Sequence, residues 1–378
     1  AAITSTYDQR NQLAQQIRDN GVVTDYDYDI AGRLSNIKHS KELITLESLT
    51  YSRDARGNII GKESNNPQAF TTQASLFNVE DISNRLTQRA DVSYTHDENG
   101  NRLTETDPQG VTTYSWDSRN RLESISLPNG DTQNFRYDFA GNLIEQVTQG
   151  QNNNDTKQFV LDDLTNVVLQ ENNNFEQLSV LTGRSIDQHL ATTQANGKVE
   201  FALSDSINST VLTTDENGLA VGEFSYDPFG ETTFSGSEYS YQYTGRVPVS
   251  NYFYYYRTRY YDPLARKFIN EDFIRLQGGK NFYQYVLNNP INFNDATGEN
   301  PLIAIIVFCG TKPKVCQAIA AGAIACIEAF TGPGVTDGTV PGWSDFIRNF
   351  GIGKICDAFK KYIENWGKKP PKPTCGIN

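Results

Sequence analysis

The feature that most constrains this 378-residue chain is an internal repeat of about twenty residues. The fullest units read aromatic, Asp, two further residues, Gly or Asn, a polar residue and an aliphatic residue. The nine aspartates of the repeat are Asp8, Asp29, Asp54, Asp81, Asp97, Asp117, Asp138, Asp162 and Asp227. Three positions after the Asp, eight units have Gly or Asn, and the ninth has Thr165. This regularity predicts one supersecondary unit used many times.

The repeat predicts a β-hairpin. In the stretch 25–29, Asp and Tyr alternate, which places Tyr26 and Tyr28 on one face of a strand. Asp29 can accept hydrogen bonds from main-chain N–H groups two residues on and open a turn. Gly or Asn tolerates the positive φ that tight turns require, so we expect positive φ at most repeat turns. Stacked edge to edge, such hairpins satisfy their backbones and build a continuous face.

Composition narrows the possible functions. Aromatic residues make up 11% of the chain, with 20 Tyr and 20 Phe, an excess that favours sheet. The net charge of -12 argues against general nucleic-acid binding, which needs a basic face. The mean hydropathy of -0.54 excludes a multi-span membrane protein. Because the sequence starts at Ala1 and has no Met, we expect a processed product or a fragment.

Beyond residue 200 the chain carries further motifs. They are Leu-Ser-Asp-Ser-Ile-Asn-Ser-Thr at 203–210, Tyr-Asp-Pro-Phe-Gly-Glu at 226–231, Tyr-Thr-Gly-Arg at 243–246, Tyr-Tyr-Tyr-Arg-Thr-Arg-Tyr-Tyr-Asp-Pro at 254–263, Gly-Gly-Lys-Asn-Phe-Tyr-Gln-Tyr-Val at 278–286 and Asn-Asn-Pro at 288–290. With the repeat, they resemble the Rhs/YD-repeat family. The resemblance covers roughly residues 1–299 and is most specific over 200–298, which resembles the Rhs-associated core.

The resemblance implies a mainly β fold: a spiralling strip of antiparallel YD-repeat hairpins, or partial Rhs shell, with a small α-helical, cysteine-rich C-terminal domain. We expect a YD-repeat strip over 1–200, the Rhs-associated core over 201–299 and a variable domain over 300–378. About ten hairpins give roughly 100 Å of sheet, enough for one turn or a small coil. The chain is then either the C-terminal piece of a longer shell or an open strip used as a surface or filament module.

Several family members cut themselves at the end of the core with an aspartic-protease-like pair. Carried over by motif, the resemblance implies that the acids are Asp272 and Asp295 and that the basic residue is Arg259 or, alternatively, Arg257. The scissile bond is then Glu299-Asn300. In such a pair, two carboxylates share a proton, so that one activates water and the other polarises the peptide carbonyl.

The chain departs from the family pattern at this site. Pro is missing after both acids, Arg266-Lys267 replaces Gly-Arg, and Glu299 replaces an apolar residue. The alternative interpretation is that Asp272 and Asp295 only cap turns, since Asp-x-x-Gly is an ordinary turn signal. Less rigid turns and a third negative charge at Glu299 predict slow or absent cleavage, with the tail still attached.

Residues 300–378 differ from the rest of the chain. They have a net charge of +4 and contain all five cysteines: Cys309, Cys316, Cys326, Cys356 and Cys375. These lack paired C-x-x-C spacing and no His lies among them, so we expect two disulfides rather than a metal site, with one cysteine free or paired between chains. Apolar runs at 301–308 and 317–330 are too short to span a bilayer, and 344–366 has helical spacing.

Two classes of function remain open. The first is an extracellular YD-repeat structural or interaction scaffold with a small C-terminal plug or docking domain. The alternative is an Rhs polymorphic toxin whose shell encloses a C-terminal effector and cuts it off, and a membrane-active effector is one form of this alternative. The expected location is extracellular or at the cell surface, and the expected partners are other copies, a larger Rhs shell or an unidentified target-cell component. No cofactor and no nucleic acid is implied, and at most self-cleavage after Glu299 makes the chain an enzyme.

Overall fold

The structure, a computed structural model, describes residues 1–66, 76–150, 154–249, 253–275 and 280–299. All of these fall in the first of two compact units, residues 1–311. The predicted helical, cysteine-rich domain over 300–378, with its disulfides, lies outside the described residues. Over the described residues the chain is mainly β and antiparallel, as the repeat predicted.

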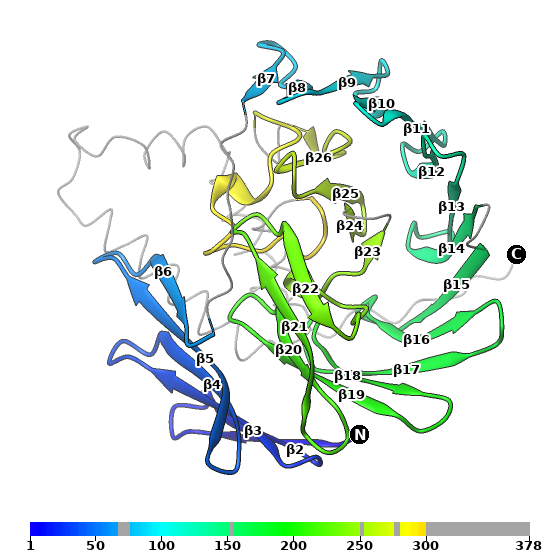
Figure 1. Ribbon diagram of the computed structural model, residues 1–378. Coiled ribbons are helices and arrows are strands. Elements are labelled where there is room, and N and C mark those ends of the chain that lie inside the picture. Colours follow the sequence, from blue (N-terminus) through cyan, green and yellow to red (C-terminus); the bar gives the residue numbers. More distant parts are fainter. Residues whose placement is uncertain (67–75, 151–153, 250–252, 276–279, 300–378) are drawn as a thin grey trace, which may run out of the picture. The chain divides into compact units, whose positions relative to one another are not determined.

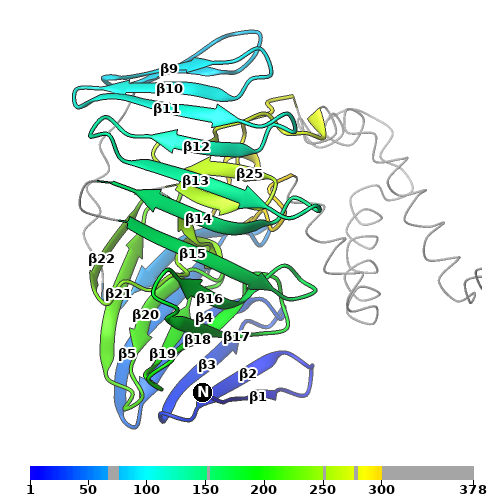
Figure 2. The ribbon, with the colours of Figure 1, turned by 90° about the vertical axis from the view of Figure 1, so that its right-hand side faces the viewer.

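Two sheets form the repeat region, and in both of them neighbouring strands follow chain order. The first sheet contains β1 (Ile3–Tyr7), β2 (Leu13–Arg18), β3 (Val22–Tyr28), β4 (Leu34–Lys41), β5 (Ile44–Arg53) and β6 (Ile59–Ser64). The second contains β7 (Phe77–Val79), β8 (Leu86–Arg89), β9 (Val92–His96), β10 (Arg102–Asp107), β11 (Gly110–Trp116), β12 (Leu122–Ser126), β13 (Thr132–Tyr137), β14 (Leu143–Gln149), β15 (Asn154–Leu161), β16 (Val167–Asn172), β17 (Gln177–Thr182), β18 (His189–Gln194), β19 (Val199–Ser204), β20 (Thr210–Thr214), β21 (Ala220–Tyr226) and β22 (Thr232–Gly236). Figure 2 shows β9 to β16 as successive rungs of one ladder.

The end of the described chain forms a third, four-stranded antiparallel sheet. It contains β23 (Pro248–Val249), β24 (Phe253–Tyr256), β25 (Arg259–Asp262) and β26 (Lys267–Phe268). Two short 3₁₀ turns accompany it, η1 (Tyr243–Gly245) and η3 (Val286–Asn288). Figure 1 shows this sheet on the concave side of the curved second sheet.

The repeat turns have the predicted geometry. The residue three positions after the Asp has positive φ in all nine units, including Thr165 at 63°. In six units the Asp Oδ1 accepts the main-chain N–H groups two and four residues on; their aspartates are Asp8, Asp29, Asp54, Asp117, Asp162 and Asp227. The unit at Asp81 differs, because its turn closes from Glu80 and is one residue longer.

The repeated aromatic residue also links consecutive units. Tyr28 donates its hydroxyl hydrogen bond to the carbonyl oxygen of Leu13 at 2.9 Å, and Tyr137 donates to that of Leu122 at 2.7 Å. The indole of Trp116 likewise donates to the carbonyl oxygen of Arg102, at 2.8 Å. Each ring therefore packs as an apolar wall while its polar end ties one unit to the one before it.

The two ends of the repeat region pack against each other. Val22, Ile37 and Leu49 of the first sheet form one buried cluster with Leu203 and Leu212 of the second. The Arg18 guanidinium donates to the carbonyl oxygen of Ala202 at 3.1 Å, and Lys62 pairs with Asp205 at 2.9 Å. The strip thus returns onto itself, in line with the single turn expected from its length.

The third sheet completes the core of this unit. A second buried cluster joins β11 to β15 with the core segment; its members are Tyr114, Leu122, Ile125, Phe135, Leu143, Phe159, Val249, Phe253, Tyr260 and Ile269. A third consists mainly of tyrosines, among them Tyr254, Tyr256 and Tyr261. Apolar burial on the strip's inner face therefore fixes the position of β25 and of the segments that follow it.

Candidate self-cleavage site

Arg259 begins β25 and lies at the centre of the candidate site. Its side chain is 3% exposed, and its guanidinium lies 3.6 Å from the centroid of the Phe268 ring on the neighbouring strand β26. Nη1 donates to the carbonyl oxygen of Phe282 at 3.0 Å. An aromatic ring on one side and a main-chain acceptor in its plane hold the guanidinium in a single orientation.

Two buried aspartates converge on this guanidinium. Asp272 follows β26 and Asp295 follows η3, and their side chains are 4% and 1% exposed. Nη2 of Arg259 lies 3.2 Å from Oδ2 of Asp272 and 3.4 Å from Oδ2 of Asp295. The structure therefore brings together the three residues that the family motif named, from three separate segments of the core.

Both aspartates also cap turns, as the alternative interpretation expected. Oδ1 of Asp272 accepts the N–H of Ile274 at 3.0 Å. Oδ1 of Asp295 accepts the N–H groups of Thr297, Gly298 and Glu299 at 2.9 to 3.3 Å. One oxygen of each carboxylate fixes the local turn and the other faces Arg259, so the two interpretations describe different atoms of the same groups.

The main chain at the predicted cleavage point reaches the same arginine. Nη2 of Arg259 donates to the carbonyl oxygen of Glu299 at 3.0 Å, and Nε donates to that of Gly298. Gly298 has a φ of 75°, and a Cβ there would lie 2.0 Å from the carbonyl oxygen of Tyr256. Only glycine fits this position, which lets the turn carry Glu299 back onto Arg259.

The electrostatics of the site keep one carboxyl protonated under mildly acidic conditions. Burial raises the pKa of Asp272 to about 6; Arg259 lowers this pKa, while the negative charges of Asp295 and Glu299 raise it. Burial, followed by the charge of Asp295, also raises the pKa of the half-buried Glu299. Arg259 thus interacts with three carboxyl groups, and the negative charges of Asp295 and Glu299 oppose the loss of the proton from Asp272.

Other residues named from the sequence lie elsewhere. Lys267 is on β26, and in the described part of the chain it forms no ion pair with Asp272 or Asp295. Arg257, the alternative base, instead pairs with Asp187 at 2.9 Å. Sequence reasoning missed Asp187 because it lies between two repeat units and belongs to no motif.

The described residues offer few other sites. Within them there is no group of three or more His, Cys, Asp or Glu side chains that could hold a metal ion. They also contain no helix long and apolar enough to cross a membrane.

Comparisons with known proteins agree with this architecture. The chain is 24% identical over 305 residues to toxin subunit YenC1 of Yersinia entomophaga, a match that covers 74% of this chain and 29% of that protein. It is 26% identical over 304 residues to the tRNA3(Ser)-specific nuclease WapA of Bacillus spizizenii, covering 77% of this chain and 12% of that one. The chain thus spans less than a third of the length of these relatives.

The fold also matches a solved structure and a family description. The crystal structure of TcdB2-TccC3 aligns with a TM-score of 0.59 at 19% sequence identity, over 78% of this chain and 20% of that one, which shows a shared fold. Residues 2–291 match the family described as Teneurin YD-shell. The expected resemblance to Rhs/YD-repeat proteins is confirmed, and the chain belongs to the teneurin YD-shell family.

Proposed function

We propose that this chain is the C-terminal part of a YD shell that cuts its own backbone after Glu299 and so releases residues 300–378. One observation carries the proposal: a single guanidinium, that of Arg259, contacts both buried carboxylates and the carbonyl oxygen of Glu299. Turn capping alone does not require two carboxylates to share a buried cation. Of the two functions that the sequence left open, this geometry favours self-cleavage.

The groups present supply each part of a peptide hydrolysis. The ionised carboxylate, Asp295 in our assignment, takes a proton from a water molecule whose oxygen adds to the carbonyl carbon of Glu299. Arg259 stabilises the negative charge that develops on the carbonyl oxygen, since it already donates to that atom. Asp272, protonated below about pH 6, gives its proton to the nitrogen of Asn300 as the C–N bond breaks. The products are a carboxylate at Glu299 and an amine at Asn300.

The relatives suggest a setting for this reaction. YenC1 is named a toxin subunit, and TccC3 is solved together with TcdB2. We propose that this chain works as part of a longer extracellular shell and that residues 300–378 are its variable effector. If the bond after Glu299 stays intact, the remaining role is the structural scaffold with an attached C-terminal domain.

Intact-mass analysis of the purified chain tests the proposal. We expect the 42.3 kDa chain to yield two products separated between Glu299 and Asn300 after incubation at pH 5. Heat-unfolded chain incubated at the same pH is the control, because it lacks the assembled site. A chain that stays whole at pH 5 over days, or that is cut at another bond, contradicts the proposal and favours the scaffold.

The pH dependence of the rate is a further prediction. Asp272 loses its proton as the pH rises through about 6, so we expect the cleavage rate to fall roughly tenfold per pH unit above that value. Cleavage at neutral pH is then slow, in keeping with the expectation from sequence. In Glu299→Gln one of the negative charges that raise the pKa of Asp272 is gone, so the midpoint should move to lower pH. First-order rates measured between pH 4 and 8 check both; a rate that rises above pH 6 would exclude Asp272 as the acid.

A further inference from the structure

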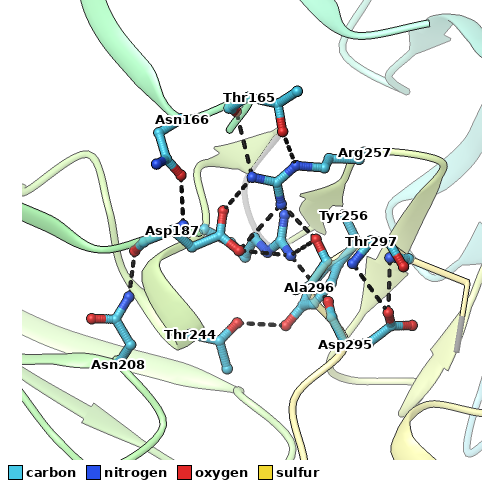
Figure 3. A network of polar contacts seen from close by, with 12 residues as sticks. Thr165, Asn166, Asp187, Asn208, Thr244, Tyr256, Arg257, Asp295, Ala296 and Thr297 are labelled. Atoms are coloured by element: carbon cyan, nitrogen blue, oxygen red, sulfur yellow. Dashed lines mark hydrogen bonds and ion pairs between the residues drawn. The ribbon is translucent and has the colours of Figure 1, made fainter. Parts of the chain in front are cut away.

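A second buried ion cluster lies beside the candidate site. It contacts the loop of residues 295–299, which carries Asp295 and Glu299. Asp187, in the connection between β17 and β18, pairs with Arg257 at 2.9 Å (Figure 3) and also pairs with Arg246 at 2.8 Å. Both arginines then donate to the carbonyl oxygen of Ala296, at 2.7 and 2.6 Å. Arg246 also donates to the carbonyl oxygen of Asp295 at 3.0 Å. The main chain of the 295–299 loop is therefore held by two arginines that do not belong to the candidate site.

The carboxylate of Asp187 is what allows the two cations to lie together. The side chains of Arg246 and Asp187 are 3% and 6% exposed, and that of Arg257 is 13% exposed. Burial alone raises the pKa of Asp187, but the charges of Arg246 and Arg257 outweigh it and lower that pKa, so the group stays ionised. Without this charge, two buried guanidinium groups would repel each other at the loop.

Asp187 itself is held by neighbouring repeat units. It has a φ of 61°, and its N–H donates to Oδ1 of Asn166 at 2.6 Å, while Asn208 donates to its carbonyl oxygen. Gly245 lies so close that a Cβ there would approach this carbonyl oxygen to 2.1 Å. Folded neighbouring turns at 162–166 and 205–209 are thus needed to present Asp187 to the arginines.

Thr165 fits the same interpretation. It is the one repeat position without Gly or Asn, and it keeps a strained φ of 63°. Its hydroxyl oxygen accepts Nε of Arg257 at 2.5 Å, and its carbonyl oxygen accepts Nη2. A Gly at this position would remove both the strain and the hydroxyl acceptor. The exception in the repeat therefore coincides with a contact to the cluster.

We propose that Asp187 is a positioning residue for self-cleavage, an inference that rests on the function proposed above. Through Arg246 and Arg257 it fixes the main chain at Asp295 and Ala296, three residues before the scissile bond. Because Asp187 depends on the surrounding repeat turns, the loop reaches its reactive geometry only after the strip around β15 to β20 has folded. Cleavage thereby reports that this part of the shell has folded.

The role of Asp187 can be tested by cell-free synthesis of the full chain, because the rate of cleavage after Glu299 can be followed from the moment each chain is made. In Asp187→Asn we expect the first-order rate of cleavage after Glu299 to fall about a hundredfold, as for a displacement of about 1 Å. In Thr165→Gly we expect a fall of about 2- to 10-fold, the worth of one hydrogen bond, together with an unchanged or raised melting temperature. If Thr165 acted only through stability, the more stable Thr165→Gly variant would instead cleave faster than the parent.

The control for lost stability is Val92→Ala, which removes buried apolar atoms from the cluster of Leu86, Val92, Tyr94 and Ala265 and belongs to neither of the turns that hold Asp187. We expect it to lower the melting temperature while leaving the cleavage rate within twofold of the parent's. Asp187→Asn that is folded and cleaves at the parent's rate overturns the proposal, as does Thr165→Gly that cleaves faster.

Hydrogen exchange separates this inference from the function on which it rests. In an Asp295→Asn background, which keeps every chain intact, Asp187→Asn should raise the exchange rate of the amides at 296–299 at least tenfold, whereas Val92→Ala should not. If the parent chain never cleaves, the proposed function fails, and this exchange measurement alone decides whether Asp187 orders the loop. Unchanged protection in Asp187→Asn would show that it does not.

Discussion

Replacing Asp295 by Asn is expected to lower the rate of cleavage after Glu299 by about a thousandfold or more. The amide cannot take a proton from water, but its oxygen can still accept the N–H groups of Thr297, Gly298 and Glu299 that Oδ1 accepts in the parent. The turn should therefore persist while the chemistry is lost. The fraction of intact chain over time at pH 5, from mass spectrometry, gives the rate.

Asp54→Asn is the matched control for this variant. Asp54 likewise caps a turn, that between β5 and β6, through the N–H groups of Arg56 and Asn58, and its hydrogen bonds stay within this turn. The Asp54→Asn variant should therefore cleave after Glu299 at the rate of the parent chain. Asp295→Asn that cleaves within tenfold of the parent would show that this carboxylate is no base, and the dyad interpretation would then be wrong.

The largest expected effect on stability is that of Arg102→Met. Arg102 is buried, and its Nη1 lies 2.8 Å from Asp262 of β25 and 3.2 Å from Glu105 of β10. The guanidinium also lies 4.3 Å from the centroid of the Tyr94 ring. Removing the cation leaves two buried carboxylates without their main partner, so we expect the free energy of unfolding to fall by about 3–5 kcal/mol. Urea unfolding in the Asp295→Asn background, where all chains remain whole, measures this.

Arg121→Met provides the comparison. Arg121 also pairs with an aspartate, Asp117 at 2.7 Å, and lies 4.8 Å from the Tyr137 ring centroid, but both charged side chains are about a quarter exposed. Water already screens this pair, so the loss should be about 1 kcal/mol or less. The difference between the two variants should shrink as the pH falls, because burial raises the pKa of Glu105 and this carboxyl then takes up a proton. If both variants lost the same free energy of unfolding, burial would not be the reason that the ion pairs of Arg102 stabilise the fold.

The hairpin repeat could be predicted because its information is local. Asp, two residues and Gly or Asn form one turn within five consecutive residues, so the side-chain acceptor and the positive φ follow from the residue types. The same holds for the exceptions: Thr165 takes positive φ because the turn demands it, and the extra residue at Glu80 leaves the turn type recognisable. The alternation that makes strands is equally local.

The candidate site could be predicted only as residues and not as an arrangement. The family motif named Arg259, Asp272 and Asp295, and left Arg257 as an equal alternative. The choice between the two arginines depends on the turn between β24 and β25, in which Arg257 has a φ of 59°. Arg259 faces the dyad, whereas Arg257 lies just before the strand and turns towards Asp187.

Sequence by itself determined the strand-and-turn repeat and its order, and the family motif supplied Asp272 and Asp295 as candidate site residues. Only the tertiary structure decided which distant charges meet: Asp187 with Arg257 across 70 residues and Arg102 with Asp262 across 160. These pairs depend on how far the strip curls, and curvature is the sum of small twists over many strands that no single turn encodes. Burial makes such pairs important for stability, because a cation removed from water carries a large desolvation cost unless a carboxylate lies beside it in the folded chain.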